Sequence, residues 1–198
     1  MTGRAARQHA AIAGIFVTVL ALGSPASAQG QSTPAEVLTV GADGAVLLPL
    51  GNFAKFSGAG LGPMARVEFR FDPVWTFTAR GGFFYHTTKP NSSRTTELPL
   101  LLGAKMFFDT PGHGWYAAAE GGWLNVTYHS KASGVFETPL PQDGTELVVS
   151  EWKVGVTATA GYRIAPLDLR AGFLFGSLRH PSELAALMAS VGYEIPIL

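Results

Sequence analysis

Hydrophobic and polar residues alternate with a period of two along most of the chain beyond residue 36. In one segment, Trp152 and Val154 fall on one face, and Glu151 and Lys153 fall on the other. Because successive side chains of a β-strand point to opposite faces, this alternation predicts strands. Eight such runs occur, at about residues 37–50, 59–71, 74–87, 95–108, 114–128, 148–163, 167–178 and 183–195. The last run is the least regular, since residues 183–189 alone also fit a short helix.

Short and long connections tend to alternate between these runs. Asp72-Pro73, residues 109–112 and residues 164–166 supply turn-forming residues at three short connections. The connections at the other ends of the runs are mostly longer, and the longest covers residues 129–147. Short turns at one end and long loops at the other are typical of outer-membrane barrels. The chain is therefore predicted to be all-β, an eight-stranded antiparallel up-and-down transmembrane β-barrel with both ends on the periplasmic side.

Alternation alone does not decide which face points into the barrel. A soluble, lipocalin-like barrel would place the apolar face inward. Here that face carries most of the aromatic rings, and an eight-stranded barrel is only just wide enough for ordinary side chains. We therefore expect the aromatic face to meet lipid. The rings expected to form girdles at the two membrane surfaces are Trp75, Tyr85, Trp115, Trp123, Trp152 and Tyr162.

The opposite face would then collect charged residues inside the barrel. Seven bases and seven acids fall on it: Asp43, Arg66, Glu68, Arg70, Arg80, Glu97, Lys105, Glu120, Glu151, Lys153, Arg163, Asp168, Arg170 and Glu194. Unpaired charge in a narrow interior is costly, so this balance predicts a network of ion pairs that plugs the lumen. The alternative is that the same residues line an ion path.

The first 36 residues differ from the rest. Arg4 and Arg7 precede an apolar run over residues 10–22, which is typical of a secretory signal peptide. The predicted cleavage site has the small residues Ala26 and Ala28 before the cleaved bond and Gln29 after it. The predicted division is a signal peptide at 1–28, a flexible periplasmic leader at 29–36, and a barrel domain at 37–198.

Composition agrees with a membrane barrel. Residues 1–28 hold two arginines, so the remaining chain has 12 basic against 14 acidic residues and no excess charge that would attract nucleic acid. Charged residues make up 14% of the chain, against about 25% in soluble domains. A lipid-facing surface explains the deficit. The chain contains no cysteine, so no disulfide holds the fold.

Over about residues 37–198 the chain resembles a known family. Glycines punctuate the first predicted strand over residues 40–46, and a polar residue, a glycine and two spaced hydrophobes mark the last, at Ser190, Gly192, Ile195 and Ile197. With the alternation of turns and loops, these features resemble the small outer-membrane barrels typified by the OmpA transmembrane domain and OmpX. The resemblance implies the outer membrane of a Gram-negative bacterium, with its lipid and lipopolysaccharide as surroundings. It also implies that the insertion machinery reads the last strand, although this chain ends in Leu198 rather than an aromatic residue.

Candidate chemistry is sparse. An acyl-transfer site would need a base beside a hydroxyl, and a hydrolase would use His129 and Ser130 with an acid such as Asp143 or Glu146. His86, His129 and His180 fall toward the long-loop rim without the spacing of metal ligands. We therefore predict no enzyme, cofactor or metal site. The leading hypothesis is a structural or surface-interaction protein that meets a partner through the loop 129–147; the alternatives are a narrow channel for ions or small solutes and a lipid-modifying enzyme.

Overall fold

The computed structural model describes residues 37–88, 94–109, 112–130, 147–178, 180 and 183–197. The predicted signal peptide (1–28), the cleavage residues Ala26, Ala28 and Gln29, and the leader (29–36) lie outside these residues, as does most of the loop 129–147. Those assignments stay predictions.

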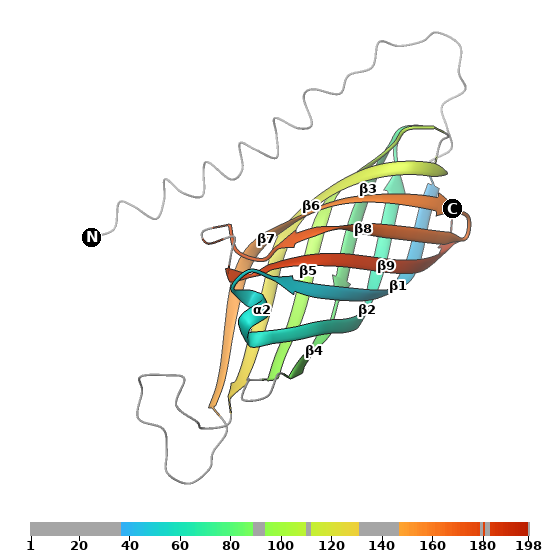
Figure 1. Ribbon diagram of the computed structural model, residues 1–198. Coiled ribbons are helices and arrows are strands. Elements are labelled where there is room, and N and C mark those ends of the chain that lie inside the picture. Colours follow the sequence, from blue (N-terminus) through green and yellow to red (C-terminus); the bar gives the residue numbers. More distant parts are fainter. Residues whose placement is uncertain are drawn as a thin grey trace, which may run out of the picture. The chain divides into compact units, whose positions relative to one another are not determined.

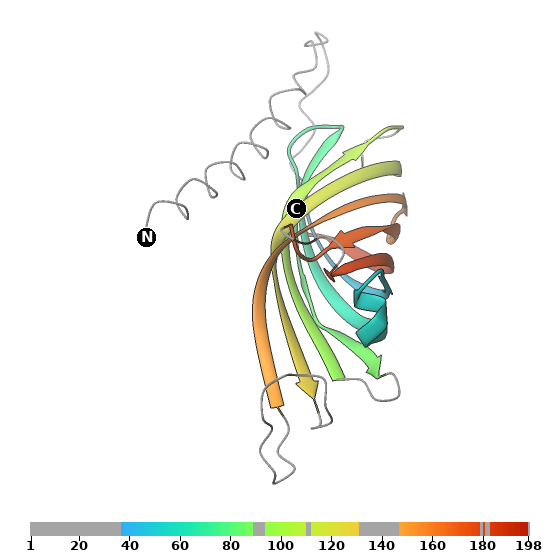
Figure 2. The same ribbon diagram turned by 60° about the vertical axis from the view of Figure 1, so that its left-hand side comes forward.

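The described chain forms one closed antiparallel sheet (Figure 1). Apart from one barrel strand that is split in two, each strand pairs with the next along the sequence. Its elements are β1 (Val37–Leu50), α2 (Phe53–Phe56), β2 (Ser57–Arg70), β3 (Trp75–Gly82), β4 (Phe84–Thr88), β5 (Arg94–Phe107), β6 (Gly114–Ser130), β7 (Leu147–Ile164), β8 (Leu167–Phe175) and β9 (Ala185–Pro196). The first and last strands, β1 and β9, pair along twelve residues and close the barrel (Figures 1 and 2). The region 185–189 is therefore strand and not helix.

The strands β3 and β4 are two parts of one barrel strand. On the β2 side, Gly82 lies opposite Met64 and Tyr85 lies opposite Leu61, so the register is the same on both sides of Phe83. The register toward β5 is also unbroken. The predicted eight-stranded up-and-down barrel is thus confirmed.

Large apolar side chains cover the outer wall. Trp152 is 61% exposed and Val191 is 56% exposed, whereas the charged residues Lys105 and Glu120 on the inner face are buried. A soluble barrel would show the reverse distribution, because water solvates charge and excludes apolar surface. The outer wall therefore faces lipid, and the soluble alternative is excluded. Among the described residues, no helix is long and apolar enough to cross a membrane.

The lumen contains an apolar layer that the alternation did not predict. Its buried side chains lie toward the long-loop ends of the strands: Ala45, Leu47, Phe53, Met64, Phe84, Leu101, Leu124, Val126, Leu174, Leu184, Ala186 and Met188. The short helix α2 falls in the segment expected to be a loop, and it places Phe53 in this layer. The two parts of the lumen therefore differ in chemistry, with an apolar layer toward the loops and a charged layer toward the periplasmic turns.

Candidate functional site

Ten charged side chains form one connected network inside the barrel. Five are acidic and five basic: Asp43, Glu68, Glu120, Asp168 and Glu194 with Arg66, Arg80, Lys105, Arg163 and Arg170. All ten are buried. Each of the eight barrel strands contributes at least one of them, so the network is a property of the closed barrel and not of any pair of neighbouring strands.

Asp168 is the centre of this network. Its Oδ2 atom lies 2.9 Å from both Arg66 Nη1 and Lys105 Nζ, and 3.4 Å from Arg163 Nη2. The Tyr116 hydroxyl donates a hydrogen bond to the other carboxylate oxygen. A carboxylate buried in this way is stabilised only by direct contacts with cations and donors, because water is excluded.

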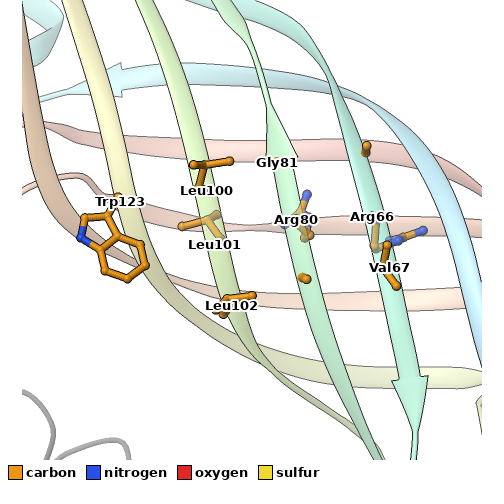
Figure 3. Close-up of a pocket in the computed structure, with 10 residues that line it drawn as sticks. Arg66, Val67, Arg80, Gly81, Leu100, Leu101, Leu102 and Trp123 are labelled. Atoms are coloured by element: carbon orange, nitrogen blue, oxygen red, sulfur yellow. The ribbon is translucent and has the colours of Figure 1, made fainter.

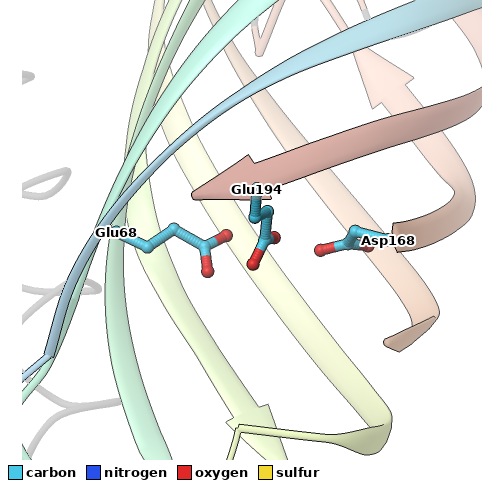
Figure 4. Close-up of side chains that lie close together, drawn as sticks. All are labelled: Glu68, Asp168 and Glu194. Carbon is cyan, nitrogen blue, oxygen red and sulfur yellow. The ribbon is translucent and has the colours of Figure 1, made fainter. Parts of the chain in front are cut away.

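Three carboxylates, those of Glu68, Asp168 and Glu194, point toward one another near the periplasmic end of the lumen (Figure 4). One oxygen of each lies within 4.8 Å of the others, a spacing that could also hold a metal ion. Cationic side chains of the protein already contact all three, since Arg163 reaches each carboxylate. The arrangement is therefore explained as an ion-pair cluster, in which a guanidinium occupies the place that a metal would take.

The buried cations also pack on aromatic rings. Lys105 Nζ lies 4.3 Å from the centre of the Tyr116 ring, and the Arg163 guanidinium lies 5.1 Å from that of Phe107. Phe107, Tyr116 and Ala118 form a small buried cluster beside the charged layer. Attraction between a cation and an aromatic face adds to the ion pairs in a desolvated site.

Four predicted members of the lumen network make no ion pair with these ten side chains among the described contacts. Arg70 is half-buried at the periplasmic end, and Glu97 lies within the apolar layer. Lys153 and Glu151 pair with each other at the loop end, where the Glu151 side chain is 52% exposed. The prediction of one network was therefore wrong for these residues. For Glu151 and Lys153 the physical reason is that β7 continues beyond the apolar layer toward the rim. Glu97 pairs with His86 instead, and Arg70 lies at the end of β2, outside ion-pair distance of the cluster.

His86 is fully buried, contrary to the expectation that it lies at a solvated rim. Its Nε2 atom lies 3.4 Å from Glu97 Oε2, and its Nδ1 atom lies 3.1 Å from the Gly58 carbonyl oxygen. Each ring nitrogen therefore has an oxygen partner inside the barrel. Gly60 makes room for the ring, because an added Cβ there would come within 2.7 Å of it.

This histidine is not placed as a catalytic base. Both ring nitrogens have partners, and the nearby Ser57 hydroxyl donates to the Thr95 hydroxyl instead (3.0 Å). Of the predicted alternative, His129 and Ser130 lie at the end of β6, while Asp143 and Glu146 lie outside the described residues. The described part of the chain therefore brings together no base, hydroxyl and acid in the order that acyl transfer requires.

The predicted girdle residues all lie on the outer wall. Trp115 and Tyr162 are cross-strand neighbours near the periplasmic end, with ring centres 5.0 Å apart, and Trp75 begins β3 at the same end. The other three lie toward the loop end: Tyr85, Trp123 and Trp152. Their action as interfacial anchors stays a prediction.

The outer wall changes from apolar to polar along a row near the loop end. Thr96, Thr127 and Ser150 are aligned by strand register on β5, β6 and β7. The Thr127 and Ser150 hydroxyls bond to each other (3.1 Å), and both bond to the Asn125 side chain. One step further toward the loops, Arg94 is exposed, and its guanidinium lies 5.0 Å from the centre of the Tyr85 ring. Polar residues above a row of apolar ones mark the level where lipid meets water.

Below this row the outer wall contains a shallow apolar groove of about 410 Å³ across β2, β3, β5 and β6 (Figure 3). Small residues, Ala65, Ala79 and Gly81, lie between the larger side chains of Val67, Leu100, Leu102 and Trp123. The groove arises because the wall loses side-chain volume on β3 while its neighbours keep theirs.

The four residues of the predicted assembly signal lie on β9 and just after it. Ser190 and Gly192 are buried and face the lumen, whereas Ile195 and Ile197 are exposed. Gly192 also has a packing role, because an added Cβ would collide with the carboxylate of Asp43. Recognition of these residues by the insertion machinery stays a prediction.

Comparison with known proteins bears on the fold. No family model matches the chain, and no curated protein matches it. The crystal structure of Ail, the attachment invasion locus protein of Yersinia pestis, matches with a TM-score of 0.55 at 8% identity, over 81% of this chain and 97% of Ail. The fold is that of a small outer-membrane barrel. The same coverage and 9% identity are found for Ail in complex with the heparin analogue sucrose octasulfate, at a TM-score of 0.51.

Neisserial surface protein A also matches, with a TM-score of 0.47 and 14% identity over 83% of this chain and 99% of that protein. At 8–9% sequence identity, the similarity to the Ail structures supports a shared fold and nothing further. The predicted resemblance to small outer-membrane barrels is confirmed at that level. The closed sheet and the apolar outer wall suit a barrel embedded in lipid, because a closed barrel leaves no ladder edge unpaired there.

Proposed function

We propose that the chain is a non-enzymatic outer-membrane protein whose sealed barrel presents its long loops at the cell surface, where they contact a partner. The observation that carries this proposal is the filling of the lumen by two layers. Ion pairs fill the part nearer the periplasm, and apolar side chains including Leu47 and Leu124 fill the part nearer the loops. An ion would have to displace both layers to cross. This favours a scaffold over the alternative of a narrow channel.

The loop 129–147 is the proposed contact surface. Its sequence holds Lys131 against the acids Glu137, Asp143 and Glu146, and an apolar, proline-containing stretch over residues 134–141. Ail has been solved with a heparin analogue, but the excess of acids here disfavours a polyanion as the partner of this chain. We therefore infer a protein partner that binds the apolar stretch.

Two further partners belong to this proposal. Outer-membrane lipid, lipopolysaccharide included, would surround the apolar wall. The insertion machinery would read the last strand during assembly, through Ser190, Gly192, Ile195 and Ile197. Cell fractionation and a heat-shift gel test the location: the folded protein should appear in the outer-membrane fraction and change its mobility on boiling. Recovery from the soluble periplasm would contradict it.

Conductance in planar bilayers tests the sealed lumen. The folded protein should give a baseline current like that of the protein-free bilayer. Stable current steps whose ion selectivity changes in Lys105→Gln would establish the channel instead. The enzyme alternative is tested by His129→Ala, which should leave the composition of lipid A unchanged relative to cells that express the unmodified protein.

A further inference from the structure

We propose that the groove on the outer wall, together with Arg94 above it, is a binding site for one phosphorylated lipid of the outer leaflet. The inference rests on the proposed partnership of the outer wall with outer-membrane lipid and makes it specific, but it requires neither a sealed lumen nor a surface partner. The groove would hold an acyl chain, and Arg94 would hold the phosphate.

The first argument is the place of the groove. It is lined by Val67, Leu102 and Trp123 on the face that meets lipid, below the row at which the wall becomes polar. In that position the available occupant is hydrocarbon. The groove has a volume of about 410 Å³, and the side chains that reach its surface are almost entirely apolar.

The second argument is the shape of the groove. Ala79 and Gly81 form its floor on β3, while Leu100 and Leu102 on β5 and Val67 on β2 are exposed apolar side chains on either side. A floor of small residues between larger ones gives a hydrocarbon chain contacts on several sides. A smooth wall would offer contacts on one side only, and dispersion attraction grows with the number of contacting atoms.

The third argument is the relation of Arg94 to the groove. Arg94 and Leu100 belong to the same face of β5 and are six residues apart. At about 3.3 Å per residue and a strand tilt of about 45°, Arg94 lies about 14 Å nearer the outer surface than Leu100. One lipid could therefore reach from the groove to Arg94, with its acyl chain below and its headgroup above.

The fourth argument is chemical. The Arg94 guanidinium lies over the Tyr85 ring, a contact that engages the face of the guanidinium and positions it against the wall. Its N–H groups lie in the guanidinium plane, a geometry suited to the paired oxygens of a phosphate. Arg94 is exposed, and strand register places His129 of β6 beside it. The positive charge of Arg94 at the headgroup level favours a lipid whose phosphate carries net negative charge over a zwitterionic one, whose own cation neutralises its phosphate.

Native mass spectrometry of the folded protein tests the site, with lipid A and its dephosphorylated form as probes. We expect one lipid A molecule to be retained. Its apparent affinity should be about tenfold higher than that of the dephosphorylated form, because the dephosphorylated form cannot make the charge-assisted bidentate contact with Arg94. Arg94→Gln should reduce this preference to about twofold or less. Ala79→Leu, which fills the groove, should lower the binding affinities for both lipids to a similar extent.

Two matched variants serve as controls. Lys55→Gln removes an exposed cation at the same end of the barrel, where the Lys55 ammonium donates a hydrogen bond to the side chain of Asn52 (2.9 Å). Ala171→Leu adds the same volume to an exposed alanine of β8. Both should bind the two probes like the unmodified protein, and a heat-shift gel confirms that each variant is folded. Equal losses in Lys55→Gln and Arg94→Gln, or in Ala171→Leu and Ala79→Leu, would overturn the site, as would the absence of a preference for lipid A in the unmodified protein.

Discussion

The guanidinium of Arg66 on β2 lies 2.9 Å from the carboxylate of Asp168 on β8, although 102 residues separate them in the sequence. The two strands are not neighbours in the sheet, so the contact crosses the lumen. Such a pair forms only when the barrel is closed. It joins parts of the chain that no backbone ladder connects.

Replacing Asp168 by asparagine should destabilise the barrel strongly. Five cations would then face four carboxylates, and the free energy of unfolding should fall by about 3–5 kcal/mol because a buried charge is left unpaired. Urea unfolding of the protein in lipid vesicles, followed by tryptophan fluorescence, measures the change.

The control for this prediction is Glu183→Gln. Glu183 is exposed and lies 3.8 Å from Lys153 at the rim, so its loss should change stability by about 1 kcal/mol or less. Adding Lys105→Met to Asp168→Asn restores the balance of charges and should recover part of the stability. If Asp168→Asn unfolds at the same urea concentration as the unmodified protein, the network does not hold the barrel together.

The buried pair of His86 and Glu97 should behave as a unit. Removing the imidazole in His86→Leu leaves the carboxylate in the apolar layer without its partner, at a cost of about 1–3 kcal/mol. The double variant His86→Leu/Glu97→Leu should be destabilised by less than the sum of the single variants. A double-mutant cycle on urea unfolding gives the coupling, expected at about 0.5–3 kcal/mol. Additive effects would show that the two groups do not interact.

Gly192 and Gly44 form a matched pair of glycines. An alanine at 192 would collide with Asp43, whereas one at 44 would meet no atom within 4 Å. We expect Gly192→Ala to destabilise the barrel and Gly44→Ala to leave its stability unchanged or raise it by about 0.5–1 kcal/mol. Refolding into vesicles without any insertion machinery separates packing from recognition. A defect of Gly192→Ala seen only in cells would assign this glycine to assembly and not to packing.

Tryptophan fluorescence tests the position of the aromatic rings. Trp115, Trp123 and Trp152 are each more than half exposed on the outer wall. For Trp115 and Trp152, lipids brominated near the headgroup should therefore quench the emission more strongly than lipids brominated at the chain end. Trp123 lines the groove and should not share this preference. Variants that keep a single tryptophan assign the effect to each ring. Equal quenching of Trp115 or Trp152 at all depths would contradict the placement of that ring at a membrane surface.

The sequence was sufficient for the barrel because two independent constraints agreed. Period-two alternation predicted the strands, and the volume of the aromatic rings required them to face outward. The same alternation predicts that His86 points into the lumen, because it follows the outward-facing Tyr85 by one residue. His86 was assigned to the rim because it lies close in sequence to a predicted long loop.

The apolar layer left a weaker signal in the sequence. Residues 46–50 and 98–102 are continuously apolar, and such runs are typical of strands that bury both faces. The inward positions of Leu47 and Leu101 could have been found from them. The ion-pair partner of each charged residue could not be predicted from the sequence, because contacts such as that of Arg66 with Asp168 depend on how strands across the lumen are offset. Alternation within one strand carries no information about that offset.

Every barrel strand supplies a charged residue to a single balanced cluster. An incomplete barrel therefore cannot exclude water from its interior without leaving a buried charge unpaired. Intermediates short of closure would have to stay wet inside, and their expulsion of water would coincide with the joining of β1 to β9. Folding into the membrane should therefore finish in one concerted step, with loss of internal water as its last event.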